Sequence, residues 1–367
     1  MTRPTRAAAV NPANGFSPDF DPRSLSRRTF LALLGLGAAG LAGCALRGRE
    51  ATSTAAPPSP TPRLPLAPPP DIEAGRVIPV SDLYVQSYRS AFEPASRDTW
   101  RLEVTGQMRQ PVTLTFADLQ DLPMVEQMHT LECIGNPVGG RLIGNLVWQG
   151  VRLREVLALA EPTAASDHLL MTGTDEYFTS VPLALALDER SLLAFSVNGE
   201  PLPDVHGFPA RVLLPGVYGQ KQPKWVTTLR AATGYQAGTW ERKGWSDTAL
   251  IQINSRIDYP PTGSVIPAGQ PLFINGIAFA DTSGVSGVEV SVDGGEHWNE
   301  ARLFPGPSSQ VWTAWQWEWT QPSAGQHILK ARAMSSAGQT QVDEGGYLSG
   351  VFPNGTSSIH SITITST

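Results

Sequence analysis

The stretch NGEPLPDVHGFPARVLLPGVYGQKQPKW, from Asn198 to Trp225, decides how the rest of this chain of 367 residues is interpreted. Its glycine and proline turns surround the apolar run Val212-Leu213-Leu214, which predicts a strand. Cationic or imidazole side chains occur four times within nineteen residues, at His206, Arg211, Lys221 and Lys224. Cations on such turns indicate a place for a small polyanion such as a phosphate. A solvated basic loop is the alternative interpretation.

A second stretch, HTLECIGNP from His129 to Pro137, contains Cys133, one of two cysteines in the chain. The residues before Cys133 are strand-like, and Gly135-Asn136-Pro137 is typical of a turn. We therefore expect the thiol at the end of a strand, exposed at a fixed position that faces a cavity. A small, buried hydrophobic residue is the alternative for a lone cysteine.

The two stretches resemble the sulfite oxidase family of molybdopterin enzymes. The matching patterns are Leu-x-Cys-x-x-Asn in one, and Asn-Gly-x-Pro-Leu-Pro, His-Gly-Phe-Pro-x-Arg-Val, Pro-Gly-x-x-Gly and Lys-Trp in the other. The similarity extends from Tyr84 to Ala337. It implies a molybdenum-molybdopterin cofactor in which Cys133 is the catalytic thiolate and the metal ligand, since a thiolate is a soft donor.

The resemblance also implies which residues hold the cofactor. The matching positions are Tyr84, Val85, Gln86, Ser87, Tyr88, Cys133, Asp175, His206, Arg211, Gln222, Pro223 and Lys224. Among them, His206, Arg211 and Lys224 are expected to bind the pterin and its phosphate. The backbone around Gln222 and Pro223 is expected to assist them.

The chain departs from the sulfite-oxidising members at two places. Those members follow Cys-x-x-Asn with arginines, where this chain has Pro137-Val138. They also have an arginine and a histidine where this chain has Gln86 and Tyr88. An arginine holds an oxyanion better than an amide does, so neutral S-oxides or N-oxides suit this chain at least as well as sulfite. Arg89 and Arg141 remain nearby, although each is more typical of a solvated surface charge.

The resemblance implies two-electron oxygen-atom transfer on a small molecule, in a direction that the sequence leaves open. The chain has no Cys-x-x-Cys-His haem motif, so electrons are expected to pass through an external carrier, either a cytochrome or a quinol-linked membrane protein. The other class of function open to the chain is that of a non-catalytic surface lipoprotein that uses its C-terminal domain for binding.

Outward from these stretches, the length predicts about two folded domains. Residues 76–247 combine a strand-like run at Trp100–Val104 with short helices expected at Thr115–Leu122 and Leu153–Ala160. Gln149-Gly150 is interpreted as a turn between strand-like flanks. This mixture predicts an α+β fold, which the resemblance identifies as a sulfite-oxidase-type molybdopterin-binding domain.

Residues 248–367 show short alternating runs between turns, which predicts an antiparallel β-sandwich. Gly287–Val292 is one such run, and it is followed by the turn Asp293-Gly294-Gly295. The three tryptophans of Ala314–Trp319 alternate, so they share one strand face, where core packing is expected. The resemblance implies an immunoglobulin-like domain that pairs subunits, and hence a homodimer.

The N-terminal segment is typical of a targeting signal. Residues 1–44 contain Ser26-Arg27-Arg28-Thr29-Phe30-Leu31, which resembles a twin-arginine export signal, and end in Leu41-Ala42-Gly43-Cys44, which resembles a lipoprotein processing box. Residues 45–75 are rich in Pro, Ser and Thr and predict an extended tether. We therefore expect export by the twin-arginine route to the outer face of the cytoplasmic membrane or the periplasm, with a lipid anchor on Cys44. A membrane-spanning helix is the alternative.

The charge of the chain argues against nucleic acid as a partner. There are 27 Lys and Arg against 33 Asp and Glu, which gives a formal net charge of −6. Such a chain has no basic field to attract a phosphate backbone. With only 16% charged residues but 35 glycines and 32 prolines, the composition favours strands and turns.

Overall fold

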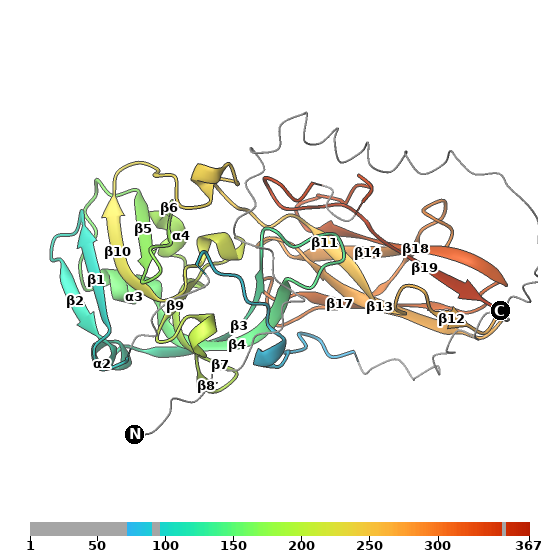
Figure 1. Cartoon of the computed structure of the whole chain (residues 1–367), viewed down its shortest axis with the longest axis horizontal. Coiled ribbons are helices and arrows are strands. Elements are labelled where there is room, and N and C mark those ends of the chain that lie inside the picture. The colour runs from blue at the N-terminus through green and yellow to red at the C-terminus, as the bar shows by residue number, and fades with distance from the viewer. Residues whose placement is uncertain (1–71, 90–95, 347–349) are drawn as a thin grey trace, which may run out of the picture. The chain divides into compact units, whose positions relative to one another are not determined.

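The computed structural model describes residues 72–89, 96–346 and 350–367 (Figure 1). The expected twin-arginine segment, the lipobox with Cys44 and nearly all of the tether lie outside the described residues. Within those ranges no helix has both the length and the apolar character needed to cross a membrane.

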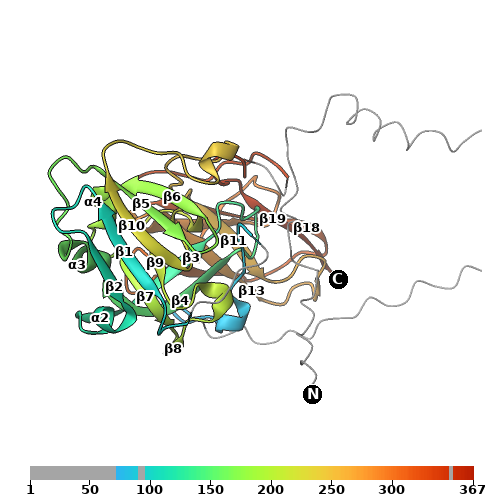
Figure 2. The ribbon, with the colours of Figure 1, turned by 60° about the vertical axis from the view of Figure 1, so that its left-hand side comes forward.

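The first sheet has the strand order β2-β1-β10-β5-β6. Its strands are β2 (Val112–Thr115), β1 (Arg101–Gly106), β10 (Val226–Ala232), β5 (His168–Gly173) and β6 (Phe178–Pro182). β1 and β10 are parallel, and the other neighbours are antiparallel. Figure 2 shows these strands side by side. β1 confirms the strand that the sequence predicts near Trp100.

Three short helices accompany this domain: α2 (Phe116–Gln120), α3 (Leu153–Ala158) and α4 (Leu183–Ala186). α2 begins after Thr115 because the Thr115 and Asp118 side chains cap each other's backbone N–H groups. α2 and α3 confirm the two predicted helices. Their buried faces, including Leu119 and Val156, pack with residues of the first sheet such as Leu102 in one hydrophobic cluster.

The second sheet has the order β3-β4-β7-β8, and β9 also pairs with β7. Its strands are β3 (Met124–Glu132), β4 (Ile143–Arg152), β7 (Leu192–Val197), β8 (Glu200–Pro201) and β9 (Arg211–Leu213). β9 confirms the strand predicted in the first stretch, shifted by one residue. β3 ends directly before Cys133, as predicted.

The predicted turn at Gln149-Gly150 is wrong. β4 runs through both residues, and only its register with β7 shifts between them. Gly150 is needed for a different reason, because a Cβ there would lie 2.1 Å from the Leu193 carbonyl oxygen. The glycine therefore allows a close approach between neighbouring strands.

The C-terminal part is a sandwich of two sheets, as predicted. One has the order β11-β13-β17-β16, with β11 (Asn254–Tyr259), β13 (Leu272–Phe279), β17 (Thr313–Trp319) and β16 (Arg302–Phe304). The other has the order β12-β19-β18-β14-β15, with β12 (Val265–Ile266), β19 (His360–Ser366), β18 (Gly325–Ser335), β14 (Val285–Ser291) and β15 (Asn299–Glu300).

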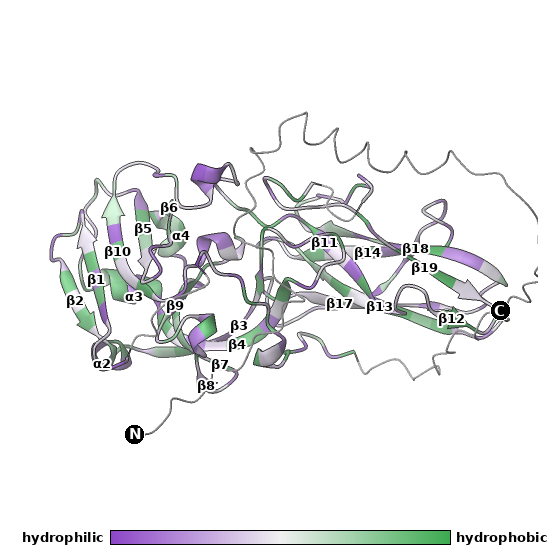
Figure 3. Ribbon diagram, viewed as in Figure 1, coloured by the Kyte–Doolittle hydropathy of each residue, from purple (hydrophilic) through white to green (hydrophobic). Residues whose placement is uncertain are grey.

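The interior of the sandwich follows the alternation of its strands (Figure 3). On β18, Leu329, Ala331 and Ala333 are buried, whereas the residues between them are more accessible. The three tryptophans of β17 all pack with this core, which confirms the predicted shared face. Each aromatic ring removes a large apolar area from water and so stabilises the contact between the sheets.

A separate hydrophobic cluster lies where the sandwich meets the second sheet. It joins Ile134 and Tyr218 of the first domain to Ile277, Phe279 and Trp312 of the sandwich. Four 3-10 turns lie in the first domain: η2 (Val80–Asp82), η3 (Asp204–His206), η4 (Gly219–Lys221) and η5 (Glu241–Lys243). Most of the predicted cofactor residues lie on irregular segments next to these elements, whereas His206 ends η3 and Arg211 begins β9.

Candidate active site

Cys133 lies at the point where β3 gives way to a tight loop. Its N–H donates to the Leu142 carbonyl oxygen at 2.9 Å, and its own carbonyl accepts from the Asn136 N–H at 2.9 Å. The thiol is free and partly buried, so it is less exposed than the sequence predicts. Burial raises the pKa of the Cys133 thiol to about 11. A metal ion would reverse this shift, because a coordinating thiol is deprotonated.

The segment from Tyr84 to Tyr88 approaches Cys133 at its first residue. Burial raises the pKa of Tyr84 well above its usual value; the neighbouring Cys133 adds to the shift and Arg211 opposes it. The Tyr84 side chain is therefore near both groups. Farther along, Val85 is half exposed, and Gln86 and Ser87 are partly buried.

Arg211 and His206 form a buried cationic corner. Nη1 of Arg211 donates to the His206 carbonyl oxygen at 3.2 Å. The Arg211 guanidinium also lies over the Trp148 ring, 5.2 Å from its centroid. Burial lowers the pKa of Arg211 to about 10. Burial, assisted by Arg211 and Lys224, lowers the pKa of His206 to about 4.

Lys224 lies on the other side of this corner. Its Nζ donates to Ser87 Oγ at 2.7 Å and to the Val205 carbonyl oxygen at 2.9 Å. Burial, followed by the neighbouring Arg211, lowers the pKa of Lys224 to about 7. A free lysine has a pKa near 10.4, so an anion at this position would restore the charge that burial disfavours.

Asp175 is brought to the same place by the turn after β5. It is buried and accepts the Tyr177 N–H at 3.1 Å. Burial raises the pKa of Asp175, while the nearby Lys224 acts in the opposite direction. The structure therefore brings Asp175 to Lys224 and Arg211, which belong to a later stretch of the sequence.

Gln222 and Pro223 stabilise the loop that carries Lys224. The Gln222 side chain donates to the Val217 carbonyl oxygen at 2.7 Å and accepts the Leu214 N–H at 3.3 Å. The Pro223 carbonyl oxygen accepts the Val212 N–H at 3.0 Å. Both residues lie beside the cationic corner, and these bonds anchor the loop to the end of β9.

Lys221 differs from the prediction that it joins the anion-binding cations. Its ammonium group is buried in an ion pair with Glu241 and also donates to the Ser180 carbonyl oxygen at 3.2 Å. Glu241 accepts a further hydrogen bond of 2.9 Å from Thr179 Oγ1. The pair ties η4 to β6 and η5. A sequence offers no sign of this pairing, because Glu241 is remote from the loop.

His129 is a neighbour of the site that the sequence does not single out. It is buried, and burial followed by Arg211 lowers its pKa to about 4, which Gln222 partly offsets. Its Nδ1 lies 3.1 Å from the side-chain nitrogen of Gln310, a residue of the sandwich. A histidine in an apolar strand, four residues before the cysteine, was the available signal.

Aromatic rings form one wall beside the cofactor residues. The Tyr88 ring lies 6.3 Å from that of Tyr177 and 6.1 Å from that of Trp240. Nζ of Lys243 lies over Tyr88 and Trp240, 5.2 Å and 4.6 Å from the ring centroids. The Tyr177 hydroxyl donates to the Gln220 carbonyl oxygen. The sequence indicated Tyr88 but not its ring partners, since these come from distant turns.

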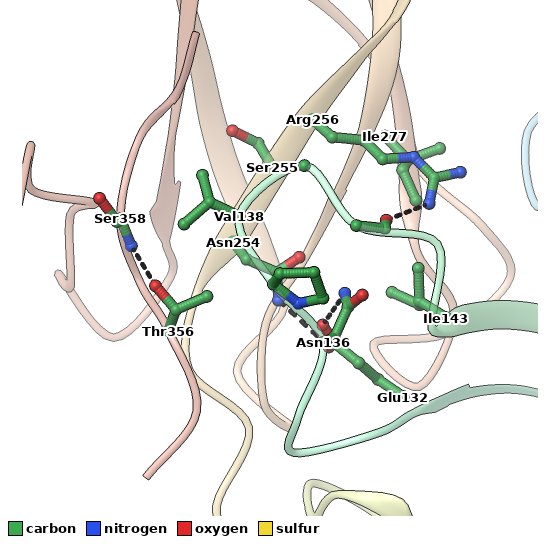
Figure 4. Close-up of a pocket in the computed structure, with 13 residues that line it drawn as sticks. Glu132, Asn136, Val138, Ile143, Asn254, Ser255, Arg256, Ile277, Thr356 and Ser358 are labelled. Carbon is green, nitrogen blue, oxygen red and sulfur yellow. Dashed lines mark hydrogen bonds between the residues drawn. The ribbon is translucent and has the colours of Figure 1, made fainter. Parts of the chain in front are cut away.

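The structure also locates the residues that stand where the sulfite-oxidising members have arginines. Pro137 and Val138 line a small cavity of about 10 Å³ between the cysteine loop and the sandwich (Figure 4). Arg141 is exposed, and Arg89 forms an exposed ion pair with Glu176. This agrees with the interpretation of both arginines as surface charges.

The chain matches two known domain families. Residues 90–240 match the domain family described as oxidoreductase molybdopterin binding domain, and residues 254–331 match a bacterial Ig domain. The mitochondrial sulfite oxidase of Rattus norvegicus is 32% identical over 293 residues, which are 68% of this chain and 53% of that protein. The chain thus spans about half the length of the curated relatives it matches.

One further relative and one solved structure are also similar to the chain. An uncharacterized oxidoreductase of Bacillus subtilis (strain 168), YuiH, is 34% identical over 146 residues, which are 40% of this chain and 72% of that protein. The sulfane dehydrogenase SoxCD from Paracoccus pantotrophus has a similar fold, with a TM-score of 0.67 and 23% identity over 80% of this chain and 84% of that one. The α+β domain followed by an immunoglobulin-like sandwich, predicted from the sequence, is thereby confirmed.

Proposed function

The chain belongs to the sulfite oxidase family of molybdopterin oxidoreductases, and from this we propose that it catalyses a two-electron oxygen-atom transfer on a small molecule. The observation that carries the proposal is that a partly buried thiol, Cys133, a buried guanidinium, Arg211, and a partly buried ammonium group, Lys224, come from separate elements to one region. A thiolate ligand and an anion-binding corner are what a metal chelated by a phosphorylated pterin requires.

The residues present fit this cofactor. Nε of Arg211 is buried and has no hydrogen-bond partner among the described residues. In the same ranges, no carboxylate forms an ion pair with Arg211 or Lys224. A buried donor without a partner costs about 1–3 kcal/mol, and an incoming phosphate or pterin oxygen would remove that cost. An anion would also offset the burial that lowers the pKa of both cations.

In this proposal each side chain has one task. The Cys133 thiolate would bind molybdenum, while His206, Arg211 and Lys224 would hold the pterin and its phosphate. Asp175 would accept from the pterin N–H groups, and Tyr84 would lie beside the metal ligand. Gln222 and Pro223 would keep the Lys224 loop in place. When bound, the cofactor would accept the oxygen atom of an S-oxide or N-oxide and supply two electrons, which the external carrier would replace, while the protein orients the cofactor and shields it from water.

The substrate we propose is a neutral S-oxide or N-oxide rather than sulfite. Pro137 and Val138 offer no cation, Arg89 is paired with Glu176, and Gln86 offers only an amide. The aromatic wall of Tyr88, Tyr177 and Trp240 supplies apolar contact surface in place of an oxyanion clamp. Losing bidentate arginine contacts weakens oxyanion binding strongly, whereas a neutral oxide depends on them less.

Expression in a host that makes the cofactor tests the proposal. We expect about one molybdenum and one pterin per chain, measured by metal analysis and pterin fluorescence. Steady-state assays with sulfite and with a panel of sulfoxides and N-oxides then test the substrate. A well-folded protein free of metal would rule out the oxidoreductase and favour the non-catalytic surface lipoprotein. A high kcat/KM with sulfite would rule out the proposed substrate class.

Localisation and partners extend the proposal. The segment Ser26–Leu31 supports export in the folded state by the twin-arginine route, and Leu41–Cys44 supports a lipid anchor at the outer face of the cytoplasmic membrane. An external cytochrome or quinol-linked protein would exchange electrons, and the sandwich would pair two copies of the chain. Mass spectrometry of the membrane-bound N-terminus tests the anchor, and light scattering tests the dimer.

A further inference from the structure

The residue before the proposed metal ligand is shared between the two domains. Glu132 is 2% exposed, and its Oε1 accepts a hydrogen bond of 2.9 Å from Asn136 Nδ2. Its Oε2 accepts one of 3.1 Å from Nδ2 of Asn254, the first residue of β11 in the sandwich. Figure 4 shows Glu132 beside both amides. Each carboxylate oxygen therefore has one amide donor, from the cysteine loop on one side and from the sandwich on the other.

The far end of the same loop is held by the sandwich as well. Nη1 of Arg256 donates to the Gly140 carbonyl oxygen at 2.9 Å, and Nε of the same side chain donates to Asp258 at 2.7 Å. A Cβ at Gly139 would lie 2.2 Å from the His360 ring, so the loop backbone is pressed against that ring. The His360 ring in turn accepts the Ile257 N–H at 3.0 Å.

Within the loop, Asn136 transmits these contacts to Cys133. Its Oδ1 accepts the Leu142 N–H at 2.9 Å, while the Leu142 carbonyl accepts the Cys133 N–H at 2.9 Å. The cavity that remains between loop and sandwich has about 10 Å³, which is room for about one water. The loop therefore has little space in which to move while these bonds are intact.

We propose that Asn254 and Arg256 of the immunoglobulin-like domain are positioning residues that fix the Cys133 loop through Glu132 and Gly140. The proposal rests on the proposed role of Cys133 as the molybdenum ligand. It gives the sandwich a task in the active site of its own chain, independent of any pairing of subunits. A metal ligand must be held by supporting hydrogen bonds to keep its orientation, and here one such support comes from the other domain.

The bond between Glu132 and Asn254 can be broken and then rebuilt. Asn254→Asp sets one carboxylate against another, and Glu132→Gln sets an amide NH2 against one of the two amide donors. In the double variant, the new amide at position 132 accepts from Asn136 and donates to the new carboxylate at position 254. The hydrogen bond between positions 132 and 254 is restored with its direction reversed, whereas the bond from Asn254 Nδ2 to the Gln252 carbonyl oxygen is lost in both variants that carry Asn254→Asp. Asn299→Asp makes the same chemical change on β15 of the sandwich and serves as the matched control.

The readout is the alkylation rate of Cys133 by iodoacetamide in cofactor-free, full-length protein, compared for all variants at the same pH of about 8.5. Peptide mass spectrometry separates Cys133 from Cys44. Each single variant should react at least about 10-fold faster than the wild type, because a hydrogen bond to a charged group is lost from the loop. The double variant and Asn299→Asp should react within about twofold of the wild type, because the double variant rebuilds the bond between positions 132 and 254 and Asn299→Asp leaves that bond intact.

Single variants that react at the wild-type rate would overturn the proposal, as would a double variant that reacts as fast as the singles. Circular dichroism confirms that each variant is folded, and the double variant still decides the matter where a single variant fails to fold. In cofactor-loaded protein, the visible thiolate-to-molybdenum absorption should change in the singles and return in the double. Absence of molybdenum from the wild type would defeat the proposed function alone, because alkylation tests the loop without it.

Discussion

Nζ of Lys224 donates a hydrogen bond of 2.7 Å to Oγ of Ser87, and so joins the two ends of the molybdopterin-binding domain. The same ammonium group lies 4.2 Å from the centroid of the Trp225 ring. Lys224 is therefore oriented by a hydroxyl and an aromatic face, with its charge directed to the place where Arg211 is buried. The geometry explains how a lysine on an irregular loop can serve as a fixed anion anchor.

Lys224→Met should weaken cofactor retention. The variant keeps the apolar stem but removes the charge, so about one hydrogen bond to a charged group is lost, which corresponds to about 10- to 100-fold in affinity. Molybdenum and pterin content after extensive dialysis measures the loss. Ser87→Ala removes the hydroxyl that orients Lys224 but keeps the charge, and it should therefore lose less of the cofactor than Lys224→Met does. Full cofactor content in Lys224→Met would contradict the assigned role.

Cys133→Ser should abolish turnover and preserve the fold. A hydroxyl is a hard, weakly acidic donor and cannot replace a thiolate at molybdenum. Arg211, Lys224 and His206 are unchanged, so pterin should still be present in the purified variant. Activity assays together with pterin fluorescence and circular dichroism check both parts. Turnover at the wild-type rate would show that the thiol is not the metal ligand.

Glu241→Ala should destabilise the protein by about 3–5 kcal/mol, because it leaves the buried ammonium group of Lys221 without its counter-ion. Urea unfolding measures the change in the free energy of unfolding. The double variant Lys221→Met with Glu241→Leu replaces the pair by apolar groups of similar size and should recover most of the loss. A single variant as stable as the wild type would mean that water reaches this ion pair.

The contribution of His129 to the stability of the cofactor-free protein should fall on acidification. Burial lowers the pKa of His129 to about 4, so between pH 4 and about 6.5 the unfolded chain binds a proton that the native chain does not. This contribution is fully present above about pH 6.5 and is lost as the pH falls toward 4, with an upper bound of about 3 kcal/mol.

His129→Gln isolates this contribution. His206 also makes the free energy of unfolding fall on acidification, whereas Glu132, whose pKa is raised to about 7 by burial, has the opposite effect. The informative quantity is therefore the difference in this free energy between the wild type and His129→Gln. Urea unfolding at pH 7 and pH 4.5 should show a larger loss for the wild type than for His129→Gln. Equal losses in the two proteins would show that His129 is protonated in the native state.

The sequence predicted those features that depend on neighbouring residues. Cys133 follows a strand and precedes a turn because Gly135, Asn136 and Pro137 interrupt β3 locally. α2 begins after Thr115 because Asp118, the capping partner of that threonine, lies three residues away. The tryptophans of β17 share a face because a strand has a period of two. In each case, the signal and its physical cause lie within a few residues of each other.

The features that could not be predicted from the sequence depend on contacts between remote segments. Gln149-Gly150 looks like a turn, but the close approach of Leu193 makes the glycine part of a strand. Lys221 looks like a phosphate ligand until Glu241 is found beside it. Asn254 gives no sign that it supports Glu132, since the two residues belong to different domains. The roles of these residues depend on strand pairing and on contacts between domains. The spacing of residues along the sequence does not reveal either of them.

The parallel pairing of β1 with β10 also affects the order of events during synthesis. β1 is the first strand of its sheet to leave the ribosome, yet its inner neighbour is completed only at Ala232. Until then β1 and β2 can form only an isolated hairpin, and such a hairpin has marginal stability in water. Non-local pairings of this kind slow folding, because loop entropy is lost before the contacts form. The nascent chain consequently cannot complete this sheet, or bring the loops that precede β10 into their final positions, until Ala232 has been translated.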